Sequence, residues 1–180
     1  ITSERYDELY RLSIEHPEKF WDQQARSLIQ WHSLWNKVVS WDFVDANVQW
    51  FQGGKLNVSE NCLDRHLLHR GDKVAIIWEG NEPEDIRQIT YRELHREVCR
   101  TATLLKKLGD KRGDRVAIYL PMIPEAAICM LACTRIGAVH TVVFAGFSSE
   151  SLRDRINDCG CKLLITANEG LRGSKTIPLK

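Results

Sequence analysis

The sequence predicts an α/β fold with a parallel βαβαβ core, preceded by an N-terminal extension of helices and a hairpin. Two observations lead to this prediction. From Ser59 onward, short and nearly continuous apolar runs alternate with segments that have helical periodicity. Apolar strands that are joined by helical crossovers are typical of a parallel sheet covered on both faces, and such crossovers are right-handed almost without exception.

The N-terminal extension differs in composition from the rest of the chain, because five of the six tryptophans lie at or before position 50. We expect two short amphipathic helices, divided at His16-Pro17, since proline suits a first helical turn. The segment VQWFQGGKLN predicts a short hairpin, in which Gly53-Gly54 would supply the positive φ angles of a tight turn. We therefore predict an extension over residues 1–58 and the first part of an α/β domain over residues 59–180.

The second part is predicted element by element. A helix is expected to start near Ser59, and the strands KVAIIWEG and IRQIT follow it. Thr90 and Glu93 form a capping box for a helix of about 91 to 108, with an apolar stripe that includes Leu108, and Gly109 can end that helix. The remaining core elements are the strand DRVAIYL, the helix PEAAICMLACTRIG, the strand AVHTVVF, the helix SESLRDRINDCG and the strand KLLIT.

Charge and hydropathy limit the classes of partner. Lys and Arg number 25 against 24 Asp and Glu, so the formal net charge of +1 gives no sign of a broad polyanion surface. The apolar stretch AAICMLAC is too short for a membrane span. We expect small-molecule substrates with no nucleic-acid or membrane partner, and the oligomeric state stays open.

The six cysteines do not have the spacing of a metal site or a disulfide framework, since none forms a C-x-x-C pair. We expect buried, reduced thiols and no metal. Reduced thiols favour a cytoplasmic location, with nucleus and mitochondrion left open. Because the sequence opens at Ile1 without a signal-peptide pattern, we expect the start to be cut from something longer.

Ligands of open parallel sheets collect outside the carboxyl ends of the strands. This rule selects the loops FAGFSS, residues 144–149, and ANEGLRGSK, residues 167–175. Gly146 would let a ligand approach the backbone, and Arg172 and Lys175 would offer a forked and a mobile cation to a phosphate. Solvated surface charge and an ordinary turn are the alternative, and no dinucleotide or P-loop glycine motif occurs.

Several separate segments, in the same order, resemble the AMP-forming acetyl-CoA synthetases of the adenylate-forming superfamily. They are LNVSENCLDRHL, VAIYLPMIPEAAICMLACTRIGAVHTVVFAGFSSESLRDRI and ITANEGLRGSKTIPLK. The resemblance runs from about Trp21 to Lys180 and covers the N-terminal third or less of such enzymes. It implies a parent enzyme that converts acetate and Mg-ATP to acetyl-adenylate and then transfers the acetyl group to coenzyme A.

The resemblance also implies site residues. In the family, the stretch that matches LRGSK contributes cations to the 3′-phosphate of coenzyme A, the loop that matches FAGF borders the same nucleotide, and an apolar residue lies near its adenine. The positions that match are Arg172, Gly173, Ser174, Lys175, Phe144, Ala145, Gly146 and Ile177. Many relatives carry Gly-Gly at 145–146 and R-G-G-R in place of R-G-S-K, so we expect weaker affinity here, since lysine lacks the two-pronged contact of arginine.

The family's ATP-phosphate loop, adenine segment, acetate pocket, hinge and C-terminal domain with the adenylation lysine match nothing in these 180 residues. ATP and Mg sites are therefore expected only in the full-length parent. We predict no catalytic residue in this chain, and no turnover by the chain alone. The alternatives are a synthetase for propionate or another short-chain acid, and a non-catalytic module that binds coenzyme A or a protein.

Overall fold

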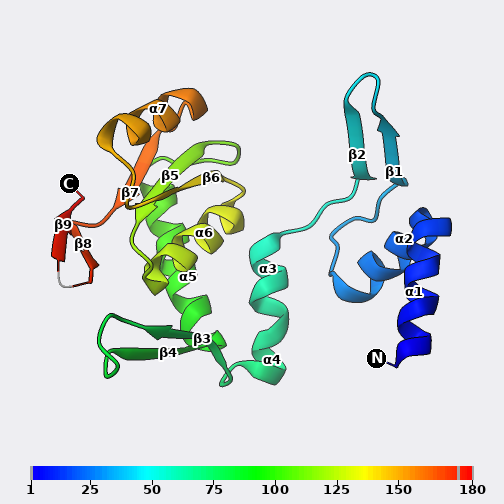
Figure 1. Ribbon diagram of the computed structural model, residues 1–180, viewed down its shortest axis with the longest axis horizontal. Coiled ribbons are helices and arrows are strands. Elements are labelled where there is room, and N and C mark those ends of the chain that lie inside the picture. The colour runs from blue at the N-terminus through cyan, green and yellow to red at the C-terminus, as the bar shows by residue number, and fades with distance from the viewer. Residues whose placement is uncertain (1, 174, 180) are drawn as a thin grey trace. The chain divides into compact units, whose positions relative to one another are not determined.

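A computed structural model of the chain describes residues 2–173 and 175–179 (Figure 1). It is a mixture of helices and small sheets that divides into two compact units, Ile1–Asn57 and Val58–Lys180. None of the helices in the described ranges combines the length and the apolar character that crossing a bilayer requires.

The first unit holds two helices and a hairpin. The helices α1 (Ser3–Glu15) and α2 (Pro17–Leu28) are divided at Pro17, which occupies the first turn of α2 as the sequence predicts. The strands β1 (Lys37–Asp42) and β2 (Asn47–Gln52) pair antiparallel. The rings of Trp35 and Phe51 lie 4.9 Å apart and anchor a small aromatic core.

The prediction that Gly53-Gly54 forms the turn of the hairpin is wrong. Gly53 does have the predicted positive φ, +81°, in a turn after β2 that the N–H of Gly54 closes by donating to the carbonyl oxygen of Phe51. The chain reverses over residues 43–46, where the carboxylate of Asp42 accepts the backbone N–H of Val44 at 2.8 Å. The side chain of Asp42 thus stabilises the hairpin turn, which was predicted to depend on glycine. Gly54 follows β2, and a Cβ there would lie 2.8 Å from the Trp31 ring. The glycine is needed for close packing against that ring.

The second unit begins with three short helical segments in place of the single helix predicted from Ser59. Its elements are α3 (Val58–Cys62), η1 (Asp64–His66), α4 (Leu67–Arg70), β3 (Val74–Glu79), β4 (Ile86–Thr90), α5 (Tyr91–Lys107), β5 (Arg115–Leu120), α6 (Pro124–Ile136), β6 (Val139–Phe144), α7 (Ser149–Cys159), β7 (Leu163–Thr166), β8 (Glu169–Arg172) and β9 (Lys175–Pro178).

The three-stranded sheet is parallel, as predicted, with the order β6-β5-β7. In its register, Ile118 of β5 lies opposite Val142 of β6 and Ile165 of β7. The prediction that the strands are covered on both faces holds for β5, where Ala117 on one face and Ile118 on the other are fully buried. It is wrong for β6, because Val142 is 50% exposed. Among the described residues, β5 is the one strand of this sheet with a neighbour on either side.

Helix α5 follows its predicted signals closely. The Thr90 hydroxyl accepts the N–H of Glu93, and the Glu93 carboxylate accepts the N–H of Thr90, which completes the capping box. These bonds from Thr90 lower the pKa of Glu93. The predicted stripe packs into the core as far as Leu105, whereas Leu108 is 60% exposed because the helix ends at Lys107.

Two antiparallel pairs complete the unit. Strands β3 and β4 form one, and β8 and β9 form the other. The second pair replaces the loop predicted over residues 167–175. Figure 1 shows β7 leading directly into this hairpin at the C-terminal end of the chain. The hairpin therefore starts from the carboxyl end of a parallel strand.

Candidate functional site

The turn after β6 is held from the neighbouring strand. The N–H of Phe147 donates to the carbonyl oxygen of Phe144 at 3.0 Å. The hydroxyl oxygen of Tyr119, on β5, lies 3.3 Å from the carbonyl oxygen of Ala145 and 3.1 Å from that of Phe147, so its proton can serve either carbonyl. A buried tyrosine thus fixes the backbone of a turn whose Phe144 ring is 54% exposed.

Gly146 has a steric role within this turn. A Cβ at this position would lie 2.5 Å from an edge carbon of the Phe144 ring. Any larger residue would therefore push that ring out of place. That Gly146 leaves the backbone open to a ligand stays a prediction; in the structure, the group nearest to its missing side chain is the ring of Phe144.

The hairpin of β8 and β9 carries the other predicted residues. In its register, Gly170 lies opposite Ile177 and Arg172 opposite Lys175. Ile177 is half-buried and Lys175 is exposed. Gly173 has φ of +58°, and the space beyond its Cα is open. Ser174 lies outside the described residues, and only the backbone of Arg172 is described.

A hollow of about 140 Å³ lies between the Phe144 turn and this hairpin. Four of the predicted site residues line it, namely Phe144, Ala145, Gly146 and Ile177. A second hollow of about 370 Å³, toward α7, shares Ala145, Gly146, Ile177 and Leu179 with the first. Gly173 and Lys175 line neither hollow but stand near the tip of the same hairpin.

Part of the wall of the smaller hollow comes from residues that were not predicted. Pro121 and Met122 follow β5 and line the smaller hollow together with Leu171 and Leu179. The rule that selected the loops after β6 and β7 applies equally to the loop after β5, because all three parallel strands end at one edge. Applied to that strand, it would have found Pro121 and Met122.

The N-terminus of α7 borders the larger hollow. Ser148 caps this helix by accepting the N–H of Ser151. The Glu150 backbone N–H, and then the hydroxyl of Ser148, lower the pKa of the Glu150 carboxyl. A carboxylate therefore already uses donors of this helix end, and a phosphate would need cations from elsewhere.

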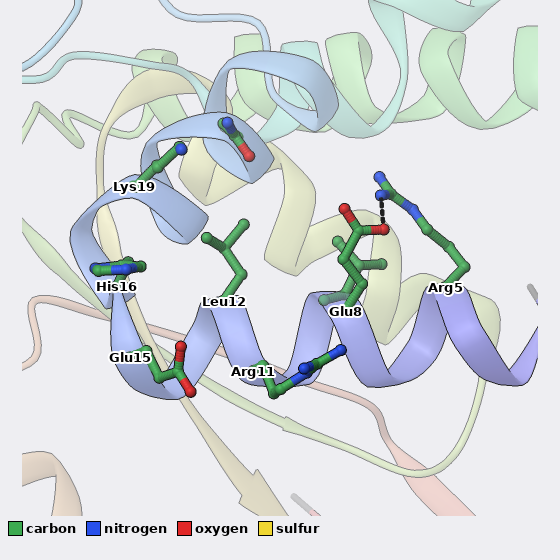
Figure 2. Close-up of a pocket in the computed structure, with 9 residues that line it drawn as sticks. Arg5, Glu8, Arg11, Leu12, Glu15, His16 and Lys19 are labelled. Atoms are coloured by element: carbon green, nitrogen blue, oxygen red, sulfur yellow. Dashed lines mark hydrogen bonds and ion pairs between the residues drawn. The ribbon is translucent and has the colours of Figure 1, made fainter.

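A hollow of about 460 Å³ lies in the first unit, between α1 and α2 (Figure 2). Although it is larger, its charges are mixed. Arg5 pairs with Glu8 at 2.6 Å, and Arg11, Glu15 and Lys19 alternate in sign along the rest of the wall. Because cations and carboxylates offset each other, nothing in this groove selects an anion.

Comparison with known proteins covers the whole chain. The family model for AMP-binding enzymes matches residues 63–179, and the model for the acetyl-coenzyme A synthetase N-terminus matches residues 6–62. The chain is 59% identical to an acetyl-coenzyme A synthetase of Syntrophus aciditrophicus, 57% to one of Pseudomonas putida and 54% to one of Alkalilimnicola ehrlichii. Each alignment takes in 100% of this chain but 28% of the relative.

Proposed function

Because the chain belongs to the AMP-binding enzyme family, we propose that it is the N-terminal part of an acetyl-coenzyme A synthetase. The parent would activate acetate with Mg-ATP to acetyl-adenylate and then transfer the acetyl group to coenzyme A. Identity of 54–59% to acetyl-coenzyme A synthetases along the full chain supports acetate over propionate or another short-chain acid. We propose two parts: a small extension over residues 1–58, and the start of the adenylate-forming domain over residues 59–180.

The proposed role of this part of the parent is to bind coenzyme A. The observation that carries it is the hollow where the Phe144 turn meets the β8–β9 hairpin. Its wall is apolar on the sides of Phe144, Met122 and Ile177, as the face of an adenine requires. The cationic positions 172 and 175 flank the turn of the same hairpin, where a phosphate of the nucleotide would lie.

The proposed site residues are Arg172, Gly173, Ser174, Lys175, Phe144, Ala145, Gly146 and Ile177. None of them is proposed to act in catalysis. They bind and orient the nucleotide end of coenzyme A, while the groups that clamp ATP, Mg and acetate would come from the rest of the parent. The 180-residue chain alone is therefore proposed to be inactive.

A cytoplasmic location is part of the proposal. Its support is that all six cysteines are free thiols, which persist in a reducing compartment. The expectation that they are buried is wrong for Cys62, which is exposed, and holds for Cys129 and Cys133.

The test is steady-state kinetics of the full-length parent with Arg172 and Lys175 both replaced by Ala. Loss of two charge-assisted contacts should raise KM for coenzyme A by about ten-fold or more. KM for ATP and for acetate should stay nearly unchanged, because those substrates bind elsewhere. Equal losses for coenzyme A and ATP would contradict the assignment.

Two further measurements separate the alternatives. A cellular species of the mass of this chain, 20.8 kDa, would favour a non-catalytic module that binds coenzyme A or a protein, and a chain several times longer favours the enzyme. A clear preference of the parent for propionate would contradict the acetate assignment. Turnover of acetate, ATP and coenzyme A by the purified 180-residue chain would refute its proposed inactivity.

A further inference from the structure

The turn of the β8–β9 hairpin receives a hydrogen bond from a distant loop. The side-chain amide of Asn81, in the connection between β3 and β4, donates to the carbonyl oxygen of Gly173 at 2.9 Å. Within the described ranges, this is the one side-chain hydrogen bond that reaches the turn from another element. Gly173 itself faces open space, so packing contributes little to holding the turn.

The loop that carries Asn81 is closed by a backbone hydrogen bond. The N–H of Gly80 donates to the carbonyl oxygen of Asp85 at 2.7 Å, which closes the connection just beyond the last pair of the β3–β4 ladder. A Cβ on Gly80 would collide with the carboxylate of Asp85, so the observed position of the Asp85 side chain depends on glycine at residue 80. The amide of Asn81 therefore extends from a short, closed loop.

The same β-pair is tied to the sheet edge at a second point. The indole N–H of Trp78 donates to the carbonyl oxygen of Met122 at 2.6 Å. Met122 follows β5 and lines the hollow of the proposed coenzyme A site. Through Trp78 and Asn81, the β3–β4 pair contacts both the loop after β5 and the hairpin after β7.

We propose that Asn81 is a positioning residue for coenzyme A, because it holds the turn between the cationic positions 172 and 175. This inference rests on the proposed function. Gly173 directly follows Arg172 in the turn, so a hydrogen bond to its carbonyl oxygen restrains the position of that turn. Asn81 lines a hollow that shares Pro121, Met122, Gly170 and Leu171 with the hollow beside Phe144, and its amide donates to the backbone of the turn. It acts on the ligand through the turn.

The first test is Asn81→Ala in the full-length parent. Loss of one neutral hydrogen bond at the surface should raise KM for coenzyme A by about five-fold. The kcat and the KM for ATP should stay near their original values. Asn81→Gln, which keeps the amide donor on a longer stem, should recover part of the affinity. Glu84→Gln is the matched control, since it changes the same loop and no described hydrogen bond joins its side chain to the hairpin.

A mutant cycle tests whether Asn81 affects coenzyme A binding through the two cations. If Asn81 acts by placing the two cations, Asn81→Ala should add almost nothing in a parent that already carries Arg172→Ala and Lys175→Ala. Full additivity of the two effects would overturn the inference. An unchanged KM for coenzyme A in the single variant would overturn it as well.

A ligand-free measurement separates this inference from the proposed function. Hydrogen exchange of the amides in residues 170–178 should be faster in the Asn81→Ala parent than in the Glu84→Gln parent. If acetate-dependent ATP–pyrophosphate exchange is absent from the parent, the proposed function fails, while the hairpin result still decides the tethering role of Asn81. Equal exchange in both variants would refute that role whatever the activity.

Discussion

The guanidinium of Arg135 donates two parallel hydrogen bonds to the carboxylate of Asp64, from Nη1 to Oδ2 at 2.7 Å and from Nη2 to Oδ1 at 2.8 Å. Arg135 lies on α6 and Asp64 on η1, so the contact joins the short helices of the second unit to its core. The ring Nε2 of His95, on α5, lies 3.2 Å from the same Oδ1. Three helical elements therefore meet at one carboxylate.

Asp64→Asn should lower the free energy of unfolding of the chain by about 2 kcal/mol, since a two-pronged contact to a charged group is lost and Arg135 keeps its charge. The two side chains are only 23% and 31% exposed, so water compensates little. Urea denaturation measures the loss. Asp154→Asn is the matched control, because the Arg153–Asp154 pair is 64% and 67% exposed and should contribute almost nothing. Similar losses in both variants would contradict this account.

The Asp64 carboxylate should make the free energy of unfolding fall at acidic pH. The hydrogen bond from Arg135, then the charges of Arg135 and His95, lower the pKa of Asp64 against the opposing effect of burial. The stabilisation is fully present above the ordinary carboxyl pKa of about 4 and is lost as the pH falls from there through the lowered folded value. Urea midpoints measured from pH 6 downward should fall less steeply in Asp64→Asn than in the unaltered chain. Parallel pH profiles would refute the assignment.

The cysteines should differ sharply in reactivity. Burial, then the charge of Glu125, raises the pKa of Cys129 to about 11, and burial, then Cys129, raises that of Cys133 to about 12. At pH 8, iodoacetamide should therefore label exposed Cys62 while Cys129 and Cys133 stay unlabelled until urea is added. Peptide mass mapping reads the sites. Early labelling of Cys133 in the native chain would contradict the burial of α6.

Strong local signals predicted the second unit well. The apolar run of β5 and the capping box of α5 specify their elements within a few residues, and the order of strands and helices specifies parallel pairing. The extension was harder to predict, because Gly53-Gly54 has the composition of a hairpin turn, whereas Gly53 turns the chain after β2 and Gly54 packs against Trp31. Strands β8 and β9 are four residues each, too short for any periodicity to be read.

The candidate site was predicted in outline. Two of its three loops follow from the rule that ligands collect at the carboxyl edge, and the structure brings Phe144 and Ile177 to one hollow. Tertiary contacts supplied the rest. The hydroxyl of Tyr119 contacts carbonyl oxygens that lie 26 and 28 positions further along the chain. The hydrogen bond from Asn81 to Gly173 spans 92 positions. No local pattern encodes such pairs.

Strands β6 and β7 form the outer edges of the parallel sheet, and neither has a further strand beside it in the described ranges. Val139, Val142 and Leu164 add exposed apolar side chains along these two strands. Unpaired edges of this kind accept strands from other molecules. When the 180-residue chain is purified alone and concentrated, we therefore expect it to aggregate by edge-to-edge polymerisation, and light scattering should rise steeply with concentration.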